Sequence, residues 1–138
     1  MLEVKIVDHD DVPADARILY SIIAATHNGK WLFVRHRDRE SWEIPGGHME
    51  EFETPDETAR RELWEETGAL SFDIEYMATY CVSDGKYKGF GRLYSADVFE
   101  MGPIPDGSEI AEVIESDELP ANLTHPLIQP VLFGWIRG

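Results

Sequence analysis

Short runs of apolar residues, many of them alternating with polar ones, predict β-strands along much of the chain. The predicted strands are Leu2–Val7, Arg17–Thr26, Lys30–Arg37, Trp42–Ile44, Phe72–Val82, Phe90–Glu100 and Ile110–Ile114. Asn28-Gly29 separates the second strand from the third, and this dipeptide is the strongest short-range signal for a β-hairpin. Loops are predicted over residues 8–15, 84–89 and 101–108, which are rich in polar residues, proline or glycine.

One stretch carries a complete set of helix signals. Thr54 is a suitable N-cap, Pro55 fits the first helical position, and Glu57 completes a capping box. Gly68 supplies the signal for the C-terminal end. We therefore expect a helix over residues 55–67, about 20 Å long at ~1.5 Å per residue.

Three glutamates share one face of this predicted helix, because Glu62, Glu65 and Glu66 stand at positions i, i+3 and i+4. The apolar stripe beside them consists of Ala59, Leu63 and Thr67. Arg61 is spaced to neutralise Glu65 and Glu57, which leaves Glu62 and Glu66 without a basic neighbour on the helix. Carboxylate oxygens suit Mg²⁺ or Mn²⁺, so the pattern favours a cation site over the alternative of a solvated acidic face.

A second helix is predicted at the C-terminal end of the chain, after a turn at residues 119–123. Its apolar stripe comprises Leu127, Ile128, Val131, Leu132, Trp135 and Ile136. Pro130 is tolerated only in or near the first turn of a helix, so the sequence leaves the start of this helix open. The stripe is expected to pack on the core. Two helices and a largely antiparallel set of strands indicate an α+β fold.

Composition narrows the classes of function. The 12 basic and 27 acidic residues give a formal charge of −15, which disfavours polymeric nucleic acid as a partner. Cys81 is the only cysteine, so no internal disulfide forms and a reducing cytoplasm is expected. The chain has no apolar run of transmembrane length and no signal-peptide pattern. Its 138 residues predict a single domain over residues 1–138, and the oligomeric state stays open.

The predicted helix and the loop before it resemble the signature of the Nudix hydrolases. The matching residues are Gly47, Glu53, Arg61-Glu62-Leu63, Glu65-Glu66 and Gly68, and Pro45-Gly46-Gly47 followed by Glu50 resembles the usual lead-in. Ala69 is small for a position that is usually aliphatic. The resemblance implies a Nudix α/β/α sandwich around a mixed sheet, and hydrolysis of a nucleoside diphosphate linked to another group with divalent cations.

The resemblance also implies roles for residues of the motif. Glu62, Glu65 and Glu66, with the carbonyl group of Gly46, would bind Mg²⁺, with Mn²⁺ as a substitute. The expected catalytic residues of the motif are Glu65, Glu62 and Arg61. Gly47, Glu53, Arg61 and Gly68 are expected to hold the motif together, with Glu53 and Arg61 joining loop to helix, and Gly47 also to approach the substrate.

Five side chains outside the motif complete the expected site. Arg35 and Arg37 belong to the densest basic cluster and would bind phosphate, the alternative being a solvated strand end. Glu109 and Glu112 follow a Pro/Gly-rich loop and either would supply a base, with Glu109 favoured; the alternative is two exposed glutamates. Asn122 offers a donor and an acceptor to a base. Its alternative role is that of a helix cap or turn residue.

The expected activity is hydrolysis of a purine nucleoside triphosphate, oxidised guanine nucleotides included, to the monophosphate and pyrophosphate. The sequence Leu119-Pro120-Ala121-Asn122 resembles the MutT-type enzymes. Phe33 or Tyr80 offers an aromatic surface to the base, although core packing is favoured for either. Tyr87 resembles instead a tyrosine of dinucleoside polyphosphate hydrolases, while Asp84 stands where ADP-ribose hydrolases have proline. A dinucleoside polyphosphate or nucleotide-sugar hydrolase and a Nudix module that binds without cleaving are the alternatives.

Overall fold

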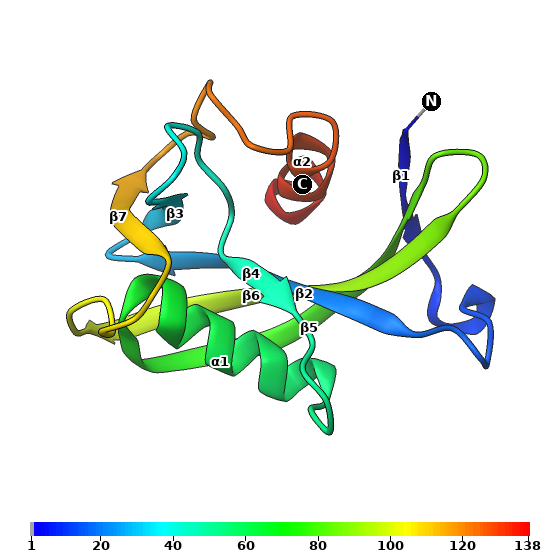
Figure 1. The fold of residues 1–138 in the computed structure, drawn as a ribbon, viewed down its shortest axis with the longest axis horizontal. Coiled ribbons are helices and arrows are strands. Elements are labelled where there is room, and N and C mark those ends of the chain that lie inside the picture. Colours follow the sequence, from blue (N-terminus) through cyan, green and yellow to red (C-terminus); the bar gives the residue numbers. More distant parts are fainter. Residues whose placement is uncertain (1) are drawn as a thin grey trace.

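The computed structural model describes residues 2–138 and arranges them around a seven-stranded mixed sheet (Figure 1). The strands are β1 (Glu3–Val7), β2 (Ile18–His27), β3 (Lys30–His36), β4 (Gly46–His48), β5 (Ala69–Ser83), β6 (Lys88–Met101) and β7 (Ile110–Ser116). The sheet order is β1-β5-β6-β2-β3-β7, with β4 added on β2. Strands β2 and β6 run parallel, and the other described pairs run antiparallel. This arrangement confirms the predicted α+β class with a mixed, largely antiparallel sheet.

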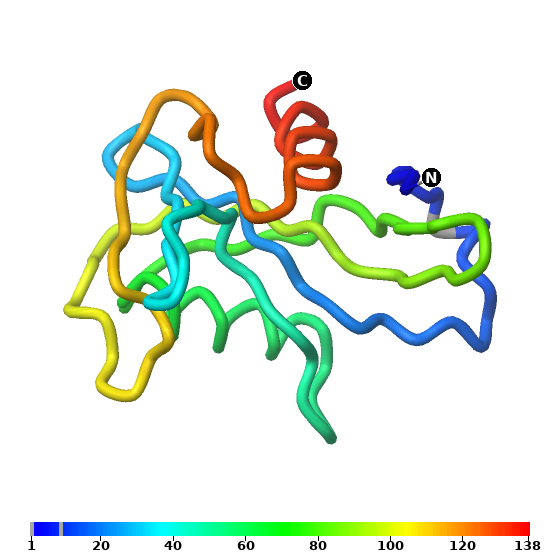
Figure 2. Tube along the Cα trace, turned by 45° about the horizontal axis from the view of Figure 1, so that its top comes forward, coloured from blue at the N-terminus to red at the C-terminus, as the bar shows by residue number. Residues whose placement is uncertain are grey.

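The two helices, α1 (Pro55–Thr67) and α2 (Gln129–Arg137), cover opposite faces of the sheet (Figure 2). Successive residues of β3 show why, since Leu32 joins the core beneath α1 and Phe33 packs against Phe133 of α2. Ala59 and Leu63 of α1 are fully buried in the first of these cores. The sandwich predicted from the family resemblance is therefore present.

Helix α1 has the predicted bounds and the predicted ends. The Thr54 hydroxyl accepts a hydrogen bond from Glu57 N, while the Glu57 carboxylate accepts one from Thr54 N, so the capping box is complete. Gly68 ends the helix in the left-handed conformation, with φ of 81°. A Cβ atom there would also lie 2.5 Å from the Gly102 carbonyl oxygen, so both backbone angle and space require glycine.

The predicted strand Trp42–Ile44 is wrong as a member of the sheet. This segment makes two isolated bridges, from Glu43 to Val34 and from Trp42 to Leu123, and the regular strand begins two residues later at Gly46. Strand β4 pairs with β2, where the amide of Ile23 already donates to the Pro45 carbonyl at 2.8 Å. The chain therefore enters the glycine loop as an irregular link between two strand pairs.

Helix α2 buries only part of the predicted apolar stripe. Ile128, Leu132 and Ile136 pack toward the sheet, whereas Leu127, Val131 and Trp135 are exposed. At ~100° per residue the predicted stripe spans about half of the helix circumference, which is wider than the face that the sheet covers. Among residues 2–138, no helix is long and apolar enough to cross a membrane.

Candidate active site

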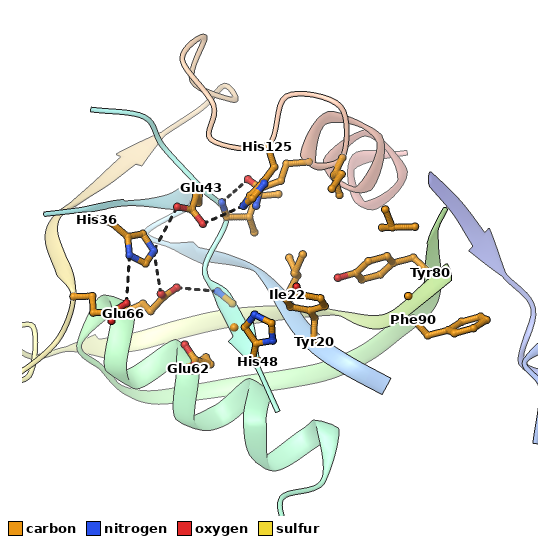
Figure 3. Close-up of a pocket in the computed structure, with 18 of the residues that line it drawn as sticks. Tyr20, Ile22, His36, Glu43, His48, Glu62, Glu66, Tyr80, Phe90 and His125 are labelled. Atoms are coloured by element: carbon orange, nitrogen blue, oxygen red, sulfur yellow. Dashed lines mark hydrogen bonds and ion pairs between the residues drawn. The ribbon is translucent and has the colours of Figure 1, made fainter. Parts of the chain in front are cut away.

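One cavity of about 590 Å³ joins the glutamate face of α1 to the ends of β2, β5 and β6 (Figure 3). Its acidic end contains Glu43, Glu62, Glu66 and Glu109 together with His36. Its other end is lined mainly by apolar and aromatic side chains, namely Tyr20, Ile22, Tyr80, Val82, Phe90 and Ile128. The cavity thus has one end suited to cations and phosphate and another suited to a flat organic ring.

The three glutamates of α1 do not all face this cavity. Glu62 and Glu66 line it, whereas Glu65 lines an adjoining recess of about 370 Å³ under the loop that joins β6 to β7. The recess also contains Glu62, Glu66 and Glu109, so the carboxylates form the boundary between the two spaces. Ser108 fixes this loop on α1, because its hydroxyl donates to the Glu65 carbonyl oxygen at 2.8 Å.

Glu66 is the most buried carboxylate of the group, with 8 % of its surface exposed. Desolvation raises its pKa to about 8, an effect opposed by the hydrogen bond that Gly46 N donates to Glu66 Oε1 at 2.9 Å. Nearby Glu62, Glu43 and Glu109 raise the pKa further by charge repulsion. Burial also raises the pKa of Glu62, and Arg61 opposes that shift. The site therefore brings carboxyl groups together in a poorly solvated place, where their ionised forms are disfavoured without a cation.

Arg61 is the cation that holds this acidic group together. Its Nε lies 2.6 Å from Glu53 Oε2, and its Nη1 lies 2.6 Å from Glu62 Oε1 and 3.1 Å from Glu65 Oε2. Glu53 also accepts hydrogen bonds from Glu50 N and from the Thr58 hydroxyl. The hydrogen bond from Arg61, together with these two, lowers the pKa of Glu53 to about 2. The expected link between loop and helix through Glu53 and Arg61 is present.

Two expectations about Arg61 were wrong. Glu62 does have a basic partner, because the long Arg61 side chain bends along the helix surface to its neighbour in sequence. Glu57 is not among the partners of Arg61 in residues 2–138, since its carboxylate is used in the capping box. Helical spacing alone predicts neither the Arg61–Glu62 pair nor the use of Glu57 in the capping box, because a flexible side chain can reach several partners.

His36 lies at the acidic end between three carboxylates. Its Nε2 is 3.4 Å from Glu43 Oε2 and 3.7 Å from Glu66 Oε2, while its Nδ1 is 3.7 Å from Glu109 Oε2 (Figure 3). It reaches them from β3, on the strand face that also carries Leu32 and Val34. His36 thereby connects α1 with the β6–β7 loop across the top of the cavity.

The sequence profile described as NUDIX domain matches residues 17–132. The chain belongs to the NUDIX family. A Bacillus subtilis (strain 168) protein, YtkD, named provisionally as an 8-oxo-dGTP diphosphatase, is 33 % identical over 115 residues, covering 83 % of this chain and 72 % of YtkD. A MutT-like protein of Streptomyces ambofaciens is 35 % identical over 81 residues, or 59 % of this chain and 48 % of that protein.

Further relatives carry other substrate names. An RNA pyrophosphohydrolase of Tolumonas auensis is 36 % identical over 58 residues, 42 % of this chain and 33 % of the relative. In three dimensions, a variant of the Bacillus subtilis pyrophosphohydrolase BsRppH has a TM-score of 0.75 at 26 % identity, with 99 % of this chain and 89 % of that one covered. A UDP-X diphosphatase has a TM-score of 0.70 at 24 % identity, covering 91 % and 65 %, which supports the fold alone. The protein is a Nudix pyrophosphohydrolase.

The donor set of the Nudix site fits a hard divalent cation. The residues offer several carboxylate oxygens, one of them on the buried Glu66, and the positive charge of a cation would offset their repulsion. Within residues 2–138, no three acidic, histidine or cysteine side chains are arranged to enclose an ion, and Arg61 forms ion pairs with Glu62 and Glu65. The hydrogen bonds of Arg61 use one oxygen of each carboxylate, Oε1 of Glu62 and Oε2 of Glu65.

Glycines keep space open beside the carboxylates of the Nudix motif. A Cβ atom on Gly47 would lie 2.5 Å from the carboxyl carbon of Glu62, and one on Gly46 would lie 2.5 Å from the Ser21 carbonyl oxygen. Both glycines line the cavity. The loop consequently approaches α1 more closely than any larger residue would allow.

The structure separates the two glutamates that were considered as a base. Glu109 lines both the cavity and the recess, whereas Glu112 lines neither. Glu112 Oε1 instead lies 3.4 Å from Arg35 Nη2, because these residues are paired across β3 and β7. Arg37 is exposed and also does not line the cavity. From the basic cluster, His36 and Arg39 line the cavity in place of Arg35 and Arg37.

Four residues named in the comparison of substrates lie outside the cavity. Asn122 is exposed, and its amide donates to the Glu40 carbonyl oxygen at 3.2 Å, as expected for a turn residue. Asp84 and Tyr87 belong to the β5–β6 turn, where Asp84 Oδ1 accepts from Tyr87 N at 2.7 Å. Phe33 lies in the core under α2, so Tyr80 is the expected aromatic residue that lines the cavity.

Several residues that line the cavity were not predicted from the sequence. Their common feature is a polar or aromatic side chain outside the motif, and they are Tyr20, His36, Glu43, His48, His125 and Gln129. His36 could have been found, because strand alternation places it with Leu32 and Val34 on the face toward α1. Gln129 interrupts an apolar stripe, which is the signal of a buried polar residue, but Pro130 obscured the start of the helix.

Proposed function

We propose that this Nudix hydrolase cleaves purine nucleoside triphosphates, oxidised guanine nucleotides included, to nucleoside monophosphate and pyrophosphate, with Mg²⁺ as the cation. The observation that carries the proposal is the two-ended cavity, in which Glu62 and Glu66 lie at one end and Tyr80 and Phe90 at the other. Its volume of about 590 Å³ is in the range of small-molecule sites. The name of YtkD agrees with such a substrate.

The residues proposed to hold Mg²⁺, or Mn²⁺ in its place, are Glu62, Glu65 and Glu66 with Gly46. When bound, these cations supply neutralisation of phosphate charge and a lowered pKa for bound water. The cations also reduce the charge repulsion between substrate and protein, because a polyphosphate alone would be repelled by a chain of charge −15. Gly47 leaves room for phosphate oxygens, and Arg61 holds Glu62 and Glu65 in the orientation that faces them.

The proposed reaction consumes one water molecule. Its oxygen bonds to phosphorus while the bridging P–O bond between the α- and β-phosphates breaks, and the water proton passes to a base. Glu109 is the proposed base, because it lines both spaces beside the carboxylates and directly follows Ser108, which anchors this loop on α1. Its side chain is 87 % exposed, so a water molecule can reach it. We propose a reducing cytoplasm as its setting, on the lone Cys81.

Product identification tests this function directly. The purified protein is incubated with Mg²⁺ and, separately, with dGTP, 8-oxo-dGTP, dATP, ADP-ribose, a dinucleoside tetraphosphate and a UDP-sugar. We expect monophosphate and pyrophosphate from the triphosphates at the highest kcat/KM. Release of inorganic phosphate alone, or faster cleavage of ADP-ribose, the dinucleotide or the UDP-sugar, contradicts the proposal. Binding of every nucleotide without turnover would instead favour the non-cleaving module.

A 5′-triphosphorylated RNA oligonucleotide belongs in the same series, because some Nudix relatives are named RNA pyrophosphohydrolases. The strongly negative chain disfavours a long phosphate backbone. We therefore expect the free triphosphate to be the better substrate. A higher kcat/KM for the RNA would move the substrate assignment to RNA ends while leaving the cation site unchanged.

A further inference from the structure

Gln129, at the start of α2, is a polar side chain that lines the cavity with only 3 % of its surface exposed. Its Oε1 accepts a hydrogen bond from the backbone N–H of Ile44 at 2.8 Å. A backbone N–H only donates, so this contact fixes the amide carbonyl toward Ile44 and prevents a flip of the side chain. The remaining end, the Nε2 amide group, has two hydrogens and no recorded hydrogen bond within residues 2–138.

Tyr80 brings a second hydrogen-bonding group to the same cavity. The residue is 3 % exposed, and its hydroxyl points toward the centre of the cavity from β5 (Figure 3). The structure records no hydrogen bond to this hydroxyl from the residues between 2 and 138. Gly91 makes room for it, since a Cβ there would lie 2.4 Å from the Tyr80 oxygen. Burial raises the pKa of Tyr80, so the group remains a hydroxyl at neutral pH.

The surroundings of these two groups are apolar. Tyr80 packs in one core cluster with Ile22, Ile128 and Val82, and the same three side chains line the cavity. Neither Gln129 Nε2 nor the Tyr80 hydroxyl is among the buried atoms of residues 2–138 that have no hydrogen-bond partner, so both are accessible from the open cavity. A ligand that covers them without supplying partners would bind at a cost in free energy. The arrangement therefore indicates a ligand that is flat and apolar on its faces and carries hydrogen-bond acceptors on one edge.

We propose that Gln129 selects nucleobases with a carbonyl group at the position where adenine has its amino group, with Tyr80 binding the neighbouring ring nitrogen. This proposal rests on the proposed triphosphate substrate and adds the identity of the base. Guanine and hypoxanthine present the O6 and N7 acceptors together, whereas adenine presents the N6 donor beside N7. Gln129 offers donors only, so adenine would face it with donor against donor.

The Tyr80 hydroxyl extends the same reading to oxidised guanine. A hydroxyl group donates or accepts, as its partner requires. It donates to N7 of guanine, and it accepts from the N7–H group that 8-oxoguanine carries in its place. The O6 carbonyl is shared by both bases, so Gln129 serves both.

ITP and ATP provide the test, because they differ at position 6, which Gln129 is proposed to read, and otherwise only in the proton on the adjacent N1. We expect kcat/KM for ITP to exceed that for ATP by about tenfold or more, the usual effect of an unmatched buried hydrogen-bonding group. Calorimetric binding of IMP and AMP, without turnover, should show the same order. Equal values for the two bases, or a preference for adenine, overturn the proposal.

Two substitutions separate base reading from packing. Gln129→Glu retains an acceptor for Ile44 N but replaces the donors by another acceptor, so the preference should shift toward AMP and ATP. Gln129→Met keeps the length of the side chain and removes both groups. It should abolish the preference without reversing it, and it should lower the melting temperature because Ile44 N loses its partner. A preference unchanged in both variants contradicts the proposal.

Asn122→Ala tests whether Asn122 or Gln129 provides the side-chain amide that binds the base. If the ITP preference disappears in Asn122→Ala and persists in the Gln129 variants, Asn122 is the reader and the proposal is wrong. The binding arm also separates this proposal from the proposed function. Weak triphosphate turnover with a retained IMP preference rejects the triphosphate substrate alone, whereas turnover without base preference rejects the role of Gln129 alone.

Discussion

Arg61 Nε lies 2.6 Å from Glu53 Oε2, and this ion pair ties the glycine loop to the helix that carries Glu62, Glu65 and Glu66. The same guanidinium reaches Glu62 and Glu65 through Nη1 and the His48 carbonyl oxygen through Nη2. One side chain therefore sets the distance between the loop and the cation ligands. Loss of its partner Glu53 should disturb both folding stability and the position of the carboxylates.

Glu53→Gln should lower the free energy of unfolding at pH 7 by about 2 kcal/mol, since it removes the charge from a mostly buried pair. The pKa of Glu53 is lowered from 4.5 to about 2 in the folded state, so its stabilisation is present above pH 4.5 and is lost as the pH falls toward 2. Urea melts across this range should show the difference between wild type and variant shrinking with falling pH. Glu51→Gln, at an exposed neighbour, is the control. A constant difference would contradict the assignment.

Ionisation of Glu66 should destabilise the cation-free protein, whereas ionisation of Glu53 stabilises it. Its pKa is raised from 4.5 to about 8 in the folded state, so the folded protein holds more protons than the unfolded chain between these values. Stability should therefore fall as the pH rises from 4.5 through 8. Glu66→Gln retains an acceptor for Gly46 N and should raise the melting temperature in EDTA at pH 8.5. A variant that melts below wild type under these conditions would show that burial of the charge is not the dominant cost.

The carboxylates outside α1 give a matched pair of variants. Glu109→Gln should lower kcat by about 10²-fold or more, as expected for loss of a general base. Glu112→Gln lies three residues on, pairs with Arg35 outside the cavity, and should leave kcat within about twofold of wild type, since exposed ion pairs contribute little. Steady-state kinetics with dGTP and Mg²⁺ compare the two. Equal losses in both variants, or none in either, would remove Glu109 from the proposed reaction.

Gly47→Ala tests the close approach of loop and helix. Its Cβ atom would lie 2.5 Å from the Glu62 carboxyl carbon, so Glu62 must move away from Arg61 and the cation position. Turnover should fall strongly while the fold persists. Gly134→Ala, in α2 with no atom within 4 Å of the added Cβ, should raise stability by about 0.5–1 kcal/mol and serves as the control. Unchanged kcat/KM in Gly47→Ala would show that turnover does not depend on the close approach of Gly47 to Glu62.

Local signals explain which parts of the fold could be predicted. Helix α1 and its two ends follow from Thr54, Glu57 and Gly68, which act on their immediate neighbours. The β2–β3 hairpin likewise follows from Asn28-Gly29, the two residues of its turn. The segment 42–44 was mispredicted because its backbone partners, Val34 and Leu123, come from two distant parts of the chain.

The site shows the same limit. The motif placed Glu62, Glu65 and Glu66 on one helix, and periodicity was sufficient for that. Arg35 was expected to bind phosphate, but its partner Glu112 is 77 residues away and becomes visible only once β3 and β7 are paired. Gln129 obtains its fixed orientation from Ile44, 85 residues away, and no local pattern reports such a contact.

Release of pyrophosphate from dGTP, measured against Mg²⁺ concentration for wild type, Glu65→Gln and Glu51→Gln, tests the central claim most directly. We predict turnover that depends on Mg²⁺ in wild type and Glu51→Gln, and a loss of at least about 10²-fold in Glu65→Gln, because an amide is a weaker ligand for a hard cation. Circular dichroism should show all three proteins folded. Wild-type activity in Glu65→Gln, or full turnover in EDTA, would contradict a cation-dependent hydrolase centred on this helix.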